Sequence, residues 1–246
     1  MYNQYDLILT VSDYVKRNIL NNAKVSEKKV KVWFNSVDTK KFRLHNGYSD
    51  ITKKVMLKYN LYSGKVIMFH GRLLPEKGVL EVILAFKKVL NLLPDLRLCI
   101  LGELQQNNDY HKLLIKTAGA LMNKQIIFTG YISYKEIEHY LNIATIFVLP
   151  SLWEEPCGLA MLEALAMEKP LITTNSGGIV ESASNNTGFI LEKDQNIVEN
   201  IFQKIVWLID NPEVSREMGK HARREIIKKR NLEYYLSNLN TILESY

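Results

Sequence analysis

The sequence predicts an α/β fold in which a parallel sheet carries crossover helices on both faces. From residue 64 onward, short apolar runs alternate with longer segments of helical periodicity, which is typical of such a sheet. The composition agrees, because 246 residues with 47% apolar and 24% charged side chains can bury one sizeable core or two small ones. The chain is therefore not disordered.

The expected elements follow from length and periodicity. Runs of five or six mostly apolar residues favour strands, and segments with apolar residues every three or four positions favour helices. Because ligands bind at the carboxyl ends of parallel strands, we expect a site there. The order is strand 65–69, helix 79–93, strand 96–101, helix 109–122, strand 125–130, helix 134–142, strand 146–150, helix 157–168 and strand 170–174.

Cysteine usage and hydropathy indicate a cytoplasmic location. Cys99 and Cys157 are far apart and show no metal-binding spacing, which fits a reducing compartment. No run of 18 apolar residues occurs, and residues 1–10 lack the basic start of a secretory signal. The inner face of a membrane is the alternative location for a peripheral protein.

The net charge of +6 favours an anionic partner, which a nucleotide sugar, an acidic membrane surface or a nucleic acid would each satisfy. The basic cluster at 221–230 is interpreted as a solvated helix face, with a lipid or RNA contact as the alternative. We expect no nucleic acid among the partners.

Residues 151–170 carry the strongest functional signal. The stretch places Glu155 and Pro156 directly before two small residues, Cys157 and Gly158, and an apolar helix. Pro156 suits a first helical turn. Free backbone N–H groups at such a turn favour an anion, and Gly158 permits its close approach. An acid near a helix start is also favourable without any ligand.

Glu163 is a further acid within this helix, which is apolar nearly all round. A buried acid needs a partner or a ligand. Eight residues of helix rise about 12 Å, so Glu155 and Glu163 would address opposite ends of an elongated ligand. A sugar joined through diphosphate to a nucleoside is such a ligand.

The stretch resembles the E-x7-E signature of the retaining glycosyltransferases of family 4, whose GT-B fold has two facing Rossmann-like domains. Members commonly show PSLWEEPFGL and then EA, so Glu155 and Glu163 match the two acids. The resemblance implies that Glu155 lies beside the donor sugar, that Gly158 and Leu159 offer amides to the diphosphate, and that Glu163 holds the ribose hydroxyls. Cys157 replaces the usual Phe and is interpreted as a small packing residue.

The segment GRLLPEKG at 71–78 is similar to the family's basic turn. The resemblance implies that Gly71 belongs to the donor site and that Arg72 and Lys77 neutralise the diphosphate during cleavage. Two cations beside a leaving diphosphate would stabilise charge that develops in the transition state; a solvated loop is the alternative. No metal motif is present, so we expect no metal and no cofactor, the nucleotide sugar being a substrate.

Further segments match in the family's order. Gly102 ends a strand where the family brings backbone against the nucleotide, although a tight turn explains it almost as well. Tyr131 and Ile132 stand where the family contacts the base through main chain, with packing as the alternative. The segment LITTNSGGIVE and its sequel resemble the family's glycine loop and supply Gly177, Gly178, Glu181 and Gly188.

The two ends suggest three parts. Residues 5–42 resemble the end of a family member's first domain and its linker, with Ser36 in place of the usual Gly. We expect a remnant of an N-terminal GT-B domain plus linker at 1–43, a nucleotide-sugar-binding Rossmann-like domain at 44–229 and a C-terminal crossing helix at 230–246. An apolar stripe in the last part either is exposed or packs on residues 5–20; it comprises Tyr234, Tyr235, Leu236, Leu239 and Ile242.

The sequence therefore predicts the donor-binding half of a retaining glycosyltransferase that moves a hexosyl group from a UDP- or GDP-sugar to a glycan or glycolipid acceptor hydroxyl. The resemblance leaves three alternatives, a fragment, the second half of a split enzyme and a remnant. Weak or absent transfer by these residues alone is expected, with a separate N-terminal-domain chain or a homo-oligomer as candidate partners. One alternative is a non-catalytic nucleotide-sugar-binding or regulatory subunit that needs a partner chain. Another is a GT-B-type sugar-nucleotide epimerase, whose own signature is missing.

Overall fold

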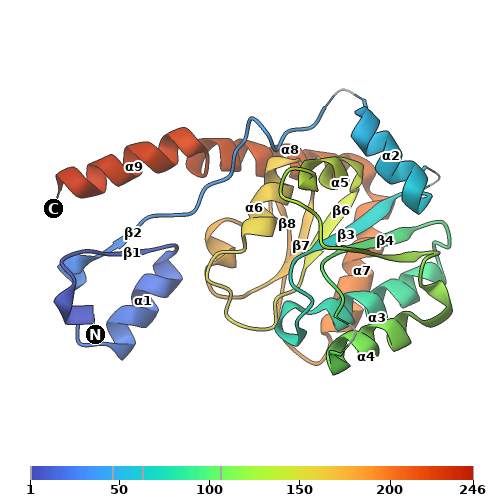
Figure 1. Cartoon of the computed structure of the whole chain (residues 1–246), viewed down its shortest axis with the longest axis horizontal. Coiled ribbons are helices and arrows are strands. Elements are labelled where there is room, and N and C mark those ends of the chain that lie inside the picture. The colour runs from blue at the N-terminus through green and yellow to red at the C-terminus, as the bar shows by residue number, and fades with distance from the viewer. Residues whose placement is uncertain (1, 46, 63, 106, 246) are drawn as a thin grey trace.

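The computed structural model describes residues 2–45, 47–62, 64–105 and 107–245, and its centre is one parallel sheet (Figure 1). The strands lie side by side in the order β5-β4-β3-β6-β7-β8. Counted from β3, this is the 3-2-1-4-5-6 order of a doubly wound, Rossmann-like sheet, so the predicted α/β fold is confirmed. The strands are β3 (Val66–His70), β4 (Arg97–Leu101), β5 (Ile126–Gly130), β6 (Ile146–Leu149), β7 (Leu171–Thr174) and β8 (Gly188–Leu191).

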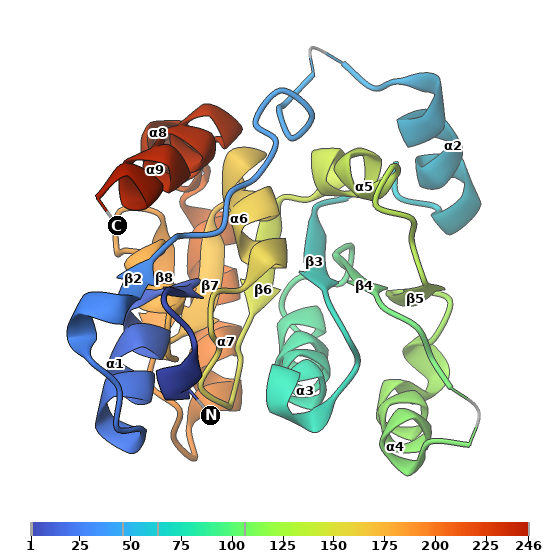
Figure 2. The ribbon, with the colours of Figure 1, turned by 60° about the vertical axis from the view of Figure 1, so that its left-hand side comes forward.

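Helices cover both faces of the sheet (Figure 2). One face carries α3 (Val79–Leu90), α4 (Asp109–Ala118) and α7 (Ile197–Asp210). The other carries α2 (Asp50–Tyr59), α5 (Ile137–Ile143), α6 (Leu159–Ala166) and α8 (Pro212–Lys229). Because both faces are covered, the central strands β3 and β6 are apolar and buried almost throughout. No helix within the described ranges is long and apolar enough to cross a membrane.

The expected helix at 157–168 is wrong at its start, because α6 begins at Leu159 and Pro156 lies in the loop before it. The backbone of Glu155 bonds to the neighbouring loop instead: its carbonyl accepts from Gly178 N at 2.7 Å. The helix expected at 109–122 ends at Ala118 and continues as a 3₁₀ turn. The helix α2 and the strand β8 were not expected from the sequence.

A small N-terminal unit, residues 2–34, stands beside the sheet (Figure 1). It pairs β1 (Ile8–Thr10) with β2 (Val30–Val32) in parallel across α1 (Asp13–Asn22). Its junction with the sheet is polar, since the Glu181 carboxylate accepts the first-turn amides of Asp13 and Tyr14 at 2.9 and 2.7 Å. The division of the chain at residues 43 and 229 stays a prediction.

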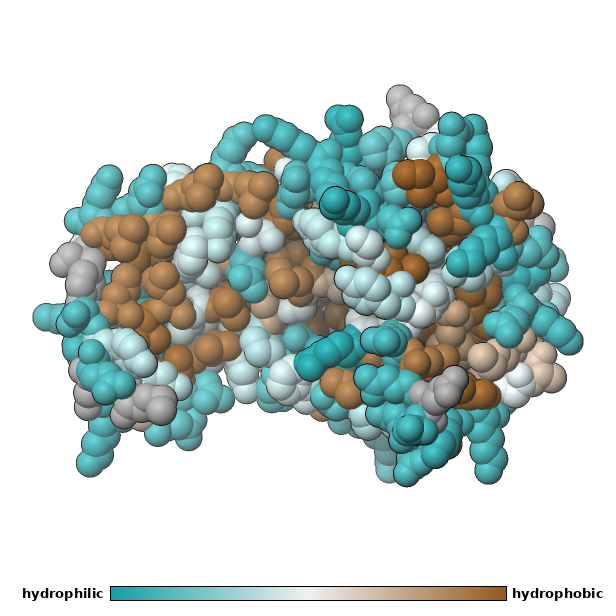
Figure 3. Space-filling model, viewed as in Figure 1, coloured by the Kyte–Doolittle hydropathy of each residue, from teal (hydrophilic) through white to brown (hydrophobic). Residues whose placement is uncertain are grey.

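The last helix, α9 (Leu232–Glu244), lies along this unit. Tyr235 stacks on Trp33 with ring centroids 4.2 Å apart, and Ile242 is buried. Tyr234 and Leu236, however, are 43% and 58% exposed. The predicted stripe is therefore split between a packed and an exposed face. Figure 3 shows hydrophobic residues gathered over this end of the molecule.

Candidate functional site

The site lies between β3 and β6, where the order in which strands are added to the sheet reverses. Strands are added to opposite sides at this point, so the loops that leave β3 and β6 diverge and open a crevice at their carboxyl ends. The loop after β3 carries Gly71, Arg72 and Lys77, and the loop after β6 carries Glu155. The topology therefore brings together two segments that are about 80 positions apart in the sequence.

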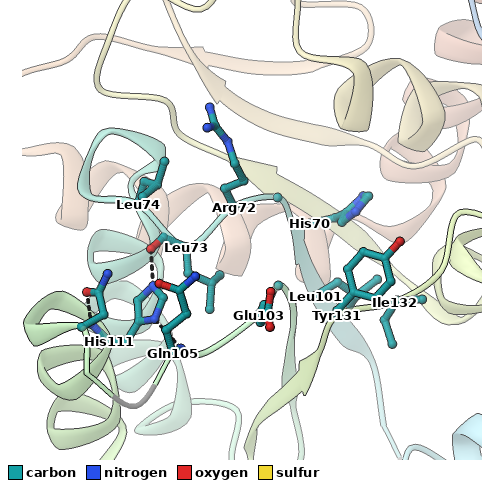
Figure 4. Close-up of a pocket in the computed structure, with 13 residues that line it drawn as sticks. His70, Arg72, Leu73, Leu74, Leu101, Glu103, Gln105, His111, Tyr131 and Ile132 are labelled. Carbon is teal, nitrogen blue, oxygen red and sulfur yellow. Dashed lines mark hydrogen bonds between the residues drawn. The ribbon is translucent and has the colours of Figure 1, made fainter.

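A cavity of about 490 Å³ opens beside the ends of β3, β4 and β5 (Figure 4). Arg72 stands at its rim, exposed, and makes no ion pair with any residue that the structure describes. Tyr131 on the opposite side is 75% exposed. Five of the predicted site residues line this cavity: Gly71, Arg72, Gly102, Tyr131 and Ile132.

His111 fixes the wall of this cavity, a role that the sequence did not reveal. Its Nδ1 accepts from the amide of Gln105, and its Nε2 lies 2.7 Å from the carbonyl of Leu73. The bonds require a neutral ring with its proton on Nε2. The buried imidazole therefore ties the loop after β4 to the loop after β3.

Glu155 lies in the β6 loop, buried and already surrounded by donors. One carboxylate oxygen, Oε2, accepts from the ammonium of Lys77, from Ser151 Oγ at 3.3 Å and from Trp153 Nε1 at 3.1 Å. The ammonium also lies 5.1 Å from the centre of the Trp153 ring. The other oxygen accepts no hydrogen bond from the described residues. Lys77, expected beside the diphosphate with Arg72, thus pairs with Glu155 in this structure.

The tandem glycines after β7 pack against this acid. Gly177 has φ = 52°, and a Cβ there would collide with the backbone of Glu155. The hydroxyl of Ser176 accepts from the Glu155 amide at 3.3 Å. The glycine loop therefore sets the backbone of Glu155, which explains why a tandem glycine stands here.

The N-terminus of α6 is left open. Gly158 takes the left-handed conformation with φ = 78°, and no side chain of a described residue caps the helix. Leu159, the first helical residue, is half exposed. Uncapped N–H groups at a helix start attract anions.

Glu163 follows on α6 and faces His70, the last residue of β3. Glu163 Oε2 and His70 Nδ1 are 3.6 Å apart, and neither atom has a hydrogen-bond partner among the described residues. Burial raises the pKa of Glu163 to about 7, against an opposing effect of Lys41. Burial lowers the pKa of His70 to about 4. No sequence pattern links these two side chains, because only the fold brings them together.

The predicted residues thus form two neighbouring groups. Five line the cavity. Outside its lining are Glu155, Gly158, Leu159 and Glu163, which follow β6, and Lys77, which comes from the loop after β3 and pairs with Glu155. Across the described parts of the chain, no cluster of three or more His, Cys, Asp or Glu side chains is placed to hold a metal ion. Cys99 is buried in β4 and Cys157 packs against the core; both are free thiols.

Comparison with known proteins identifies relatives. Residues 58–225 match the family model described as glycosyl transferases group 1. The spore coat protein SA of Bacillus subtilis (strain 168) is 27% identical over 246 residues, covering 96% of this chain and 64% of the relative. The capsular polysaccharide biosynthesis glycosyltransferase CapM of Staphylococcus aureus is 27% identical, covering 97% of this chain and 61% of the relative. The chain spans less than two thirds of these relatives.

Solved structures share the fold. A glycosyltransferase from Rickettsia africae ESF-5 superposes with a TM-score of 0.87 at 26% identity, over 97% of this chain and 63% of its own. Anabaena Alr3699/HepE, solved in complex with UDP and glucose, superposes with a TM-score of 0.83 at 19% identity, over 99% of this chain and 65% of its own. The second likeness concerns the fold alone.

Proposed function

The chain belongs to the glycosyl transferases group 1 family, and we propose that it forms the donor-binding half of a retaining enzyme. The reaction would transfer a hexosyl group from a nucleotide diphosphate sugar to an acceptor hydroxyl in glycan or glycolipid assembly. One observation carries the proposal: the loops after the adjacent strands β3 and β6 carry Arg72, the Lys77–Glu155 pair and the uncapped N-terminus of α6 at the switch point of the sheet, and Arg72 makes no ion pair with a described residue.

Each group has a role in this proposal. Arg72 and the amides of Gly158 and Leu159 hold the diphosphate and stabilise the charge that develops as the sugar leaves. Lys77 fixes Glu155, whose second oxygen accepts no hydrogen bond from a described residue and would accept one from a sugar hydroxyl. Retention follows if the acceptor approaches on the face that the diphosphate leaves.

We expect the residues that bind the acceptor to come from another domain or chain. The lining of the cavity comes from residues 70–132 alone. In a cleft between two domains, these residues would form one of the two walls. Orientation of the acceptor supplies much of the rate in such reactions. We therefore expect donor binding without robust transfer from these 246 residues, and a partner chain or domain that completes the cleft. A non-catalytic, nucleotide-sugar-binding subunit is the second candidate, favoured by the same one-sided lining.

The proposal is tested by calorimetric titration of the chain with UDP, GDP, ADP and their sugars. UDP comes first because a neighbour of the same fold was solved with it. Arg72→Ala is expected to weaken binding at least tenfold, by the loss of a charge-assisted contact. Arg224→Ala, on the exposed face of α8, removes the same charge and should change nothing. A folded sample that binds none of these ligands contradicts the proposal.

A further inference from the structure

Glu163 and His70 leave two complementary polar atoms unused at the crevice. Glu163 Oε2 and His70 Nδ1 are both buried, face each other at 3.6 Å and have no hydrogen-bond partner in the described parts of the chain. The gap exceeds the 2.7–3.2 Å of an N–H···O bond by only about half an ångström. The side chains of Glu163 and His70 keep 12% and 20% of their surface exposed, and His70 lines the cavity.

The chemistry of the pair depends on where one proton resides. A protonated Glu163 can donate to Nδ1 of the ring. An ionised Glu163 can instead accept from Nδ1–H, because a neutral imidazole carries its proton on either nitrogen. Only the ionised form offers both oxygens as acceptors, which is what a ligand with hydroxyl donors requires.

We propose that His70 is a positioning residue of the donor site: its Nδ1–H closes onto Oε2 of Glu163 when ligand hydroxyls bind the other oxygen, and the proton of Glu163 leaves for solvent. The inference rests on the proposed function, which gives Glu163 the ribose hydroxyls. His70 also lines the cavity, so the ring that faces Glu163 belongs to the wall of the ligand space (Figure 4).

The surroundings of the pair favour loss of the Glu163 proton and a hydrogen bond from His70. Burial keeps the His70 ring neutral, with a pKa lowered to about 4, while the pKa of Glu163 is raised to about 7. The charge of Lys41 opposes the rise in the pKa of Glu163. This lysine is held against Tyr134, 3.6 Å from the ring centroid, and donates to its carbonyl. Burial raises the pKa of Tyr134, and the charges of Glu163, Asp38 and Glu138 add to the rise.

A pH dependence of binding follows. Below about pH 7, the proton on Glu163 competes with the ligand hydroxyls, so affinity should fall by up to about tenfold per pH unit. Above that range, affinity should be flat. Near pH 6, binding should release up to about one proton per ligand, and near pH 8.5 almost none.

The test measures the affinity and proton release of the chain with UDP, GDP and ADP between pH 5.5 and 9, in buffers of differing ionisation enthalpy. His70→Asn keeps an N–H donor near the position of Nδ1, while His70→Leu has nearly the same shape without a donor, which makes them a matched pair. His70→Leu should weaken binding about tenfold at pH 8.5 and shift the pH midpoint upward; His70→Asn should stay near wild type. Glu163→Gln corrects for the titration of the nucleotide phosphate itself.

Equal behaviour of the Leu and Asn variants, or a wild-type proton release that Glu163→Gln retains, overturns the role of His70. Carboxyl and imidazole NMR titration of the ligand-free chain gives a second measurement that needs no ligand and no variant to fold. Coupled titration of residues 70 and 163 is expected, and independent titration overturns the inference. If no nucleotide binds while the coupling is seen, the proposed function fails and the pairing stands.

Discussion

Two buried acids, Glu155 in the loop after β6 and Glu163 on α6, differ in how many hydrogen bonds they accept. Glu155 has a lysine, a hydroxyl and an indole N–H on one oxygen before any ligand arrives. Glu163 is nearly as buried but accepts no hydrogen bond from the described residues. The first carboxylate is held in place by the fold, whereas the second keeps a buried oxygen without a described hydrogen-bond partner, which costs stability.

The largest loss of stability is expected from removing the cation that pairs with Glu155. Lys77→Met keeps the length of the side chain but leaves the buried Glu155 charge without its cation, since both side chains are only 12% and 10% exposed. We expect the free energy of unfolding, measured by urea denaturation at pH 7.5, to fall by about 3 kcal/mol.

A neighbouring pair serves as the control. Lys193 pairs with Glu154, whose side chain is 50% exposed, so Lys193→Met should cost less than about 1 kcal/mol. Equal losses for the two variants would show that the Glu155 cluster contributes no more than a surface ion pair.

The two acids should also differ in ligand binding. Glu163→Gln replaces a charged acceptor by a neutral one, so affinity for a nucleoside diphosphate should fall by about 1.5–3 kcal/mol. Glu155→Gln should leave that affinity nearly intact, because Glu155 is proposed to face the sugar, which the bare diphosphate lacks. Calorimetry of both variants with the diphosphate and the full donor checks this, and equal losses with the bare diphosphate refute the division of roles.

A third difference concerns stability against pH. The folded chain holds the proton of Glu163 up to about pH 7, whereas the unfolded chain loses it near its ordinary pKa of 4.5. The folded state thus binds more protons between these values, and this group's contribution to stability falls as pH rises through them. His70, with its lowered pKa of about 4, acts with the opposite sign between pH 4 and 6.5.

Comparing wild type with Glu163→Gln isolates the acid. At pH 8 the Gln variant should be the more stable by about 1–3 kcal/mol, and the advantage should vanish near pH 5. Thermal and urea unfolding across this range measure the difference. A variant that is less stable at pH 8 would show that the charge of Glu163 has a partner in the native protein.

The sequence predicted what depends on local pattern. Strand and helix alternation predicted the fold class, and the positions 71, 72, 102, 131 and 132 that the family resemblance singled out line one cavity. The start of α6 could not be predicted, because the backbone of Glu155 bonds to the loop at 176–178, a long-range contact. The pairing of Lys77 with Glu155 and of His70 with Glu163 likewise depends on strand order, which no local pattern contains. The roles of the ten predicted site residues stay predictions.

The smallest loss of stability is expected from removing one of the three donors to Glu155, the indole of Trp153. Trp153→Phe removes one donor to Oε2, an indole N–H at 3.1 Å, and keeps an aromatic ring beside the Lys77 ammonium. Since Lys77 and Ser151 still donate, the loss in the free energy of unfolding should be about 1 kcal/mol, the usual worth of one hydrogen bond. In Lys77→Met the same substitution should cost more, because the indole is then one of two remaining donors. A double-mutant cycle measured by urea denaturation gives the coupling, and additive losses would mean that the three donors act independently on the acid.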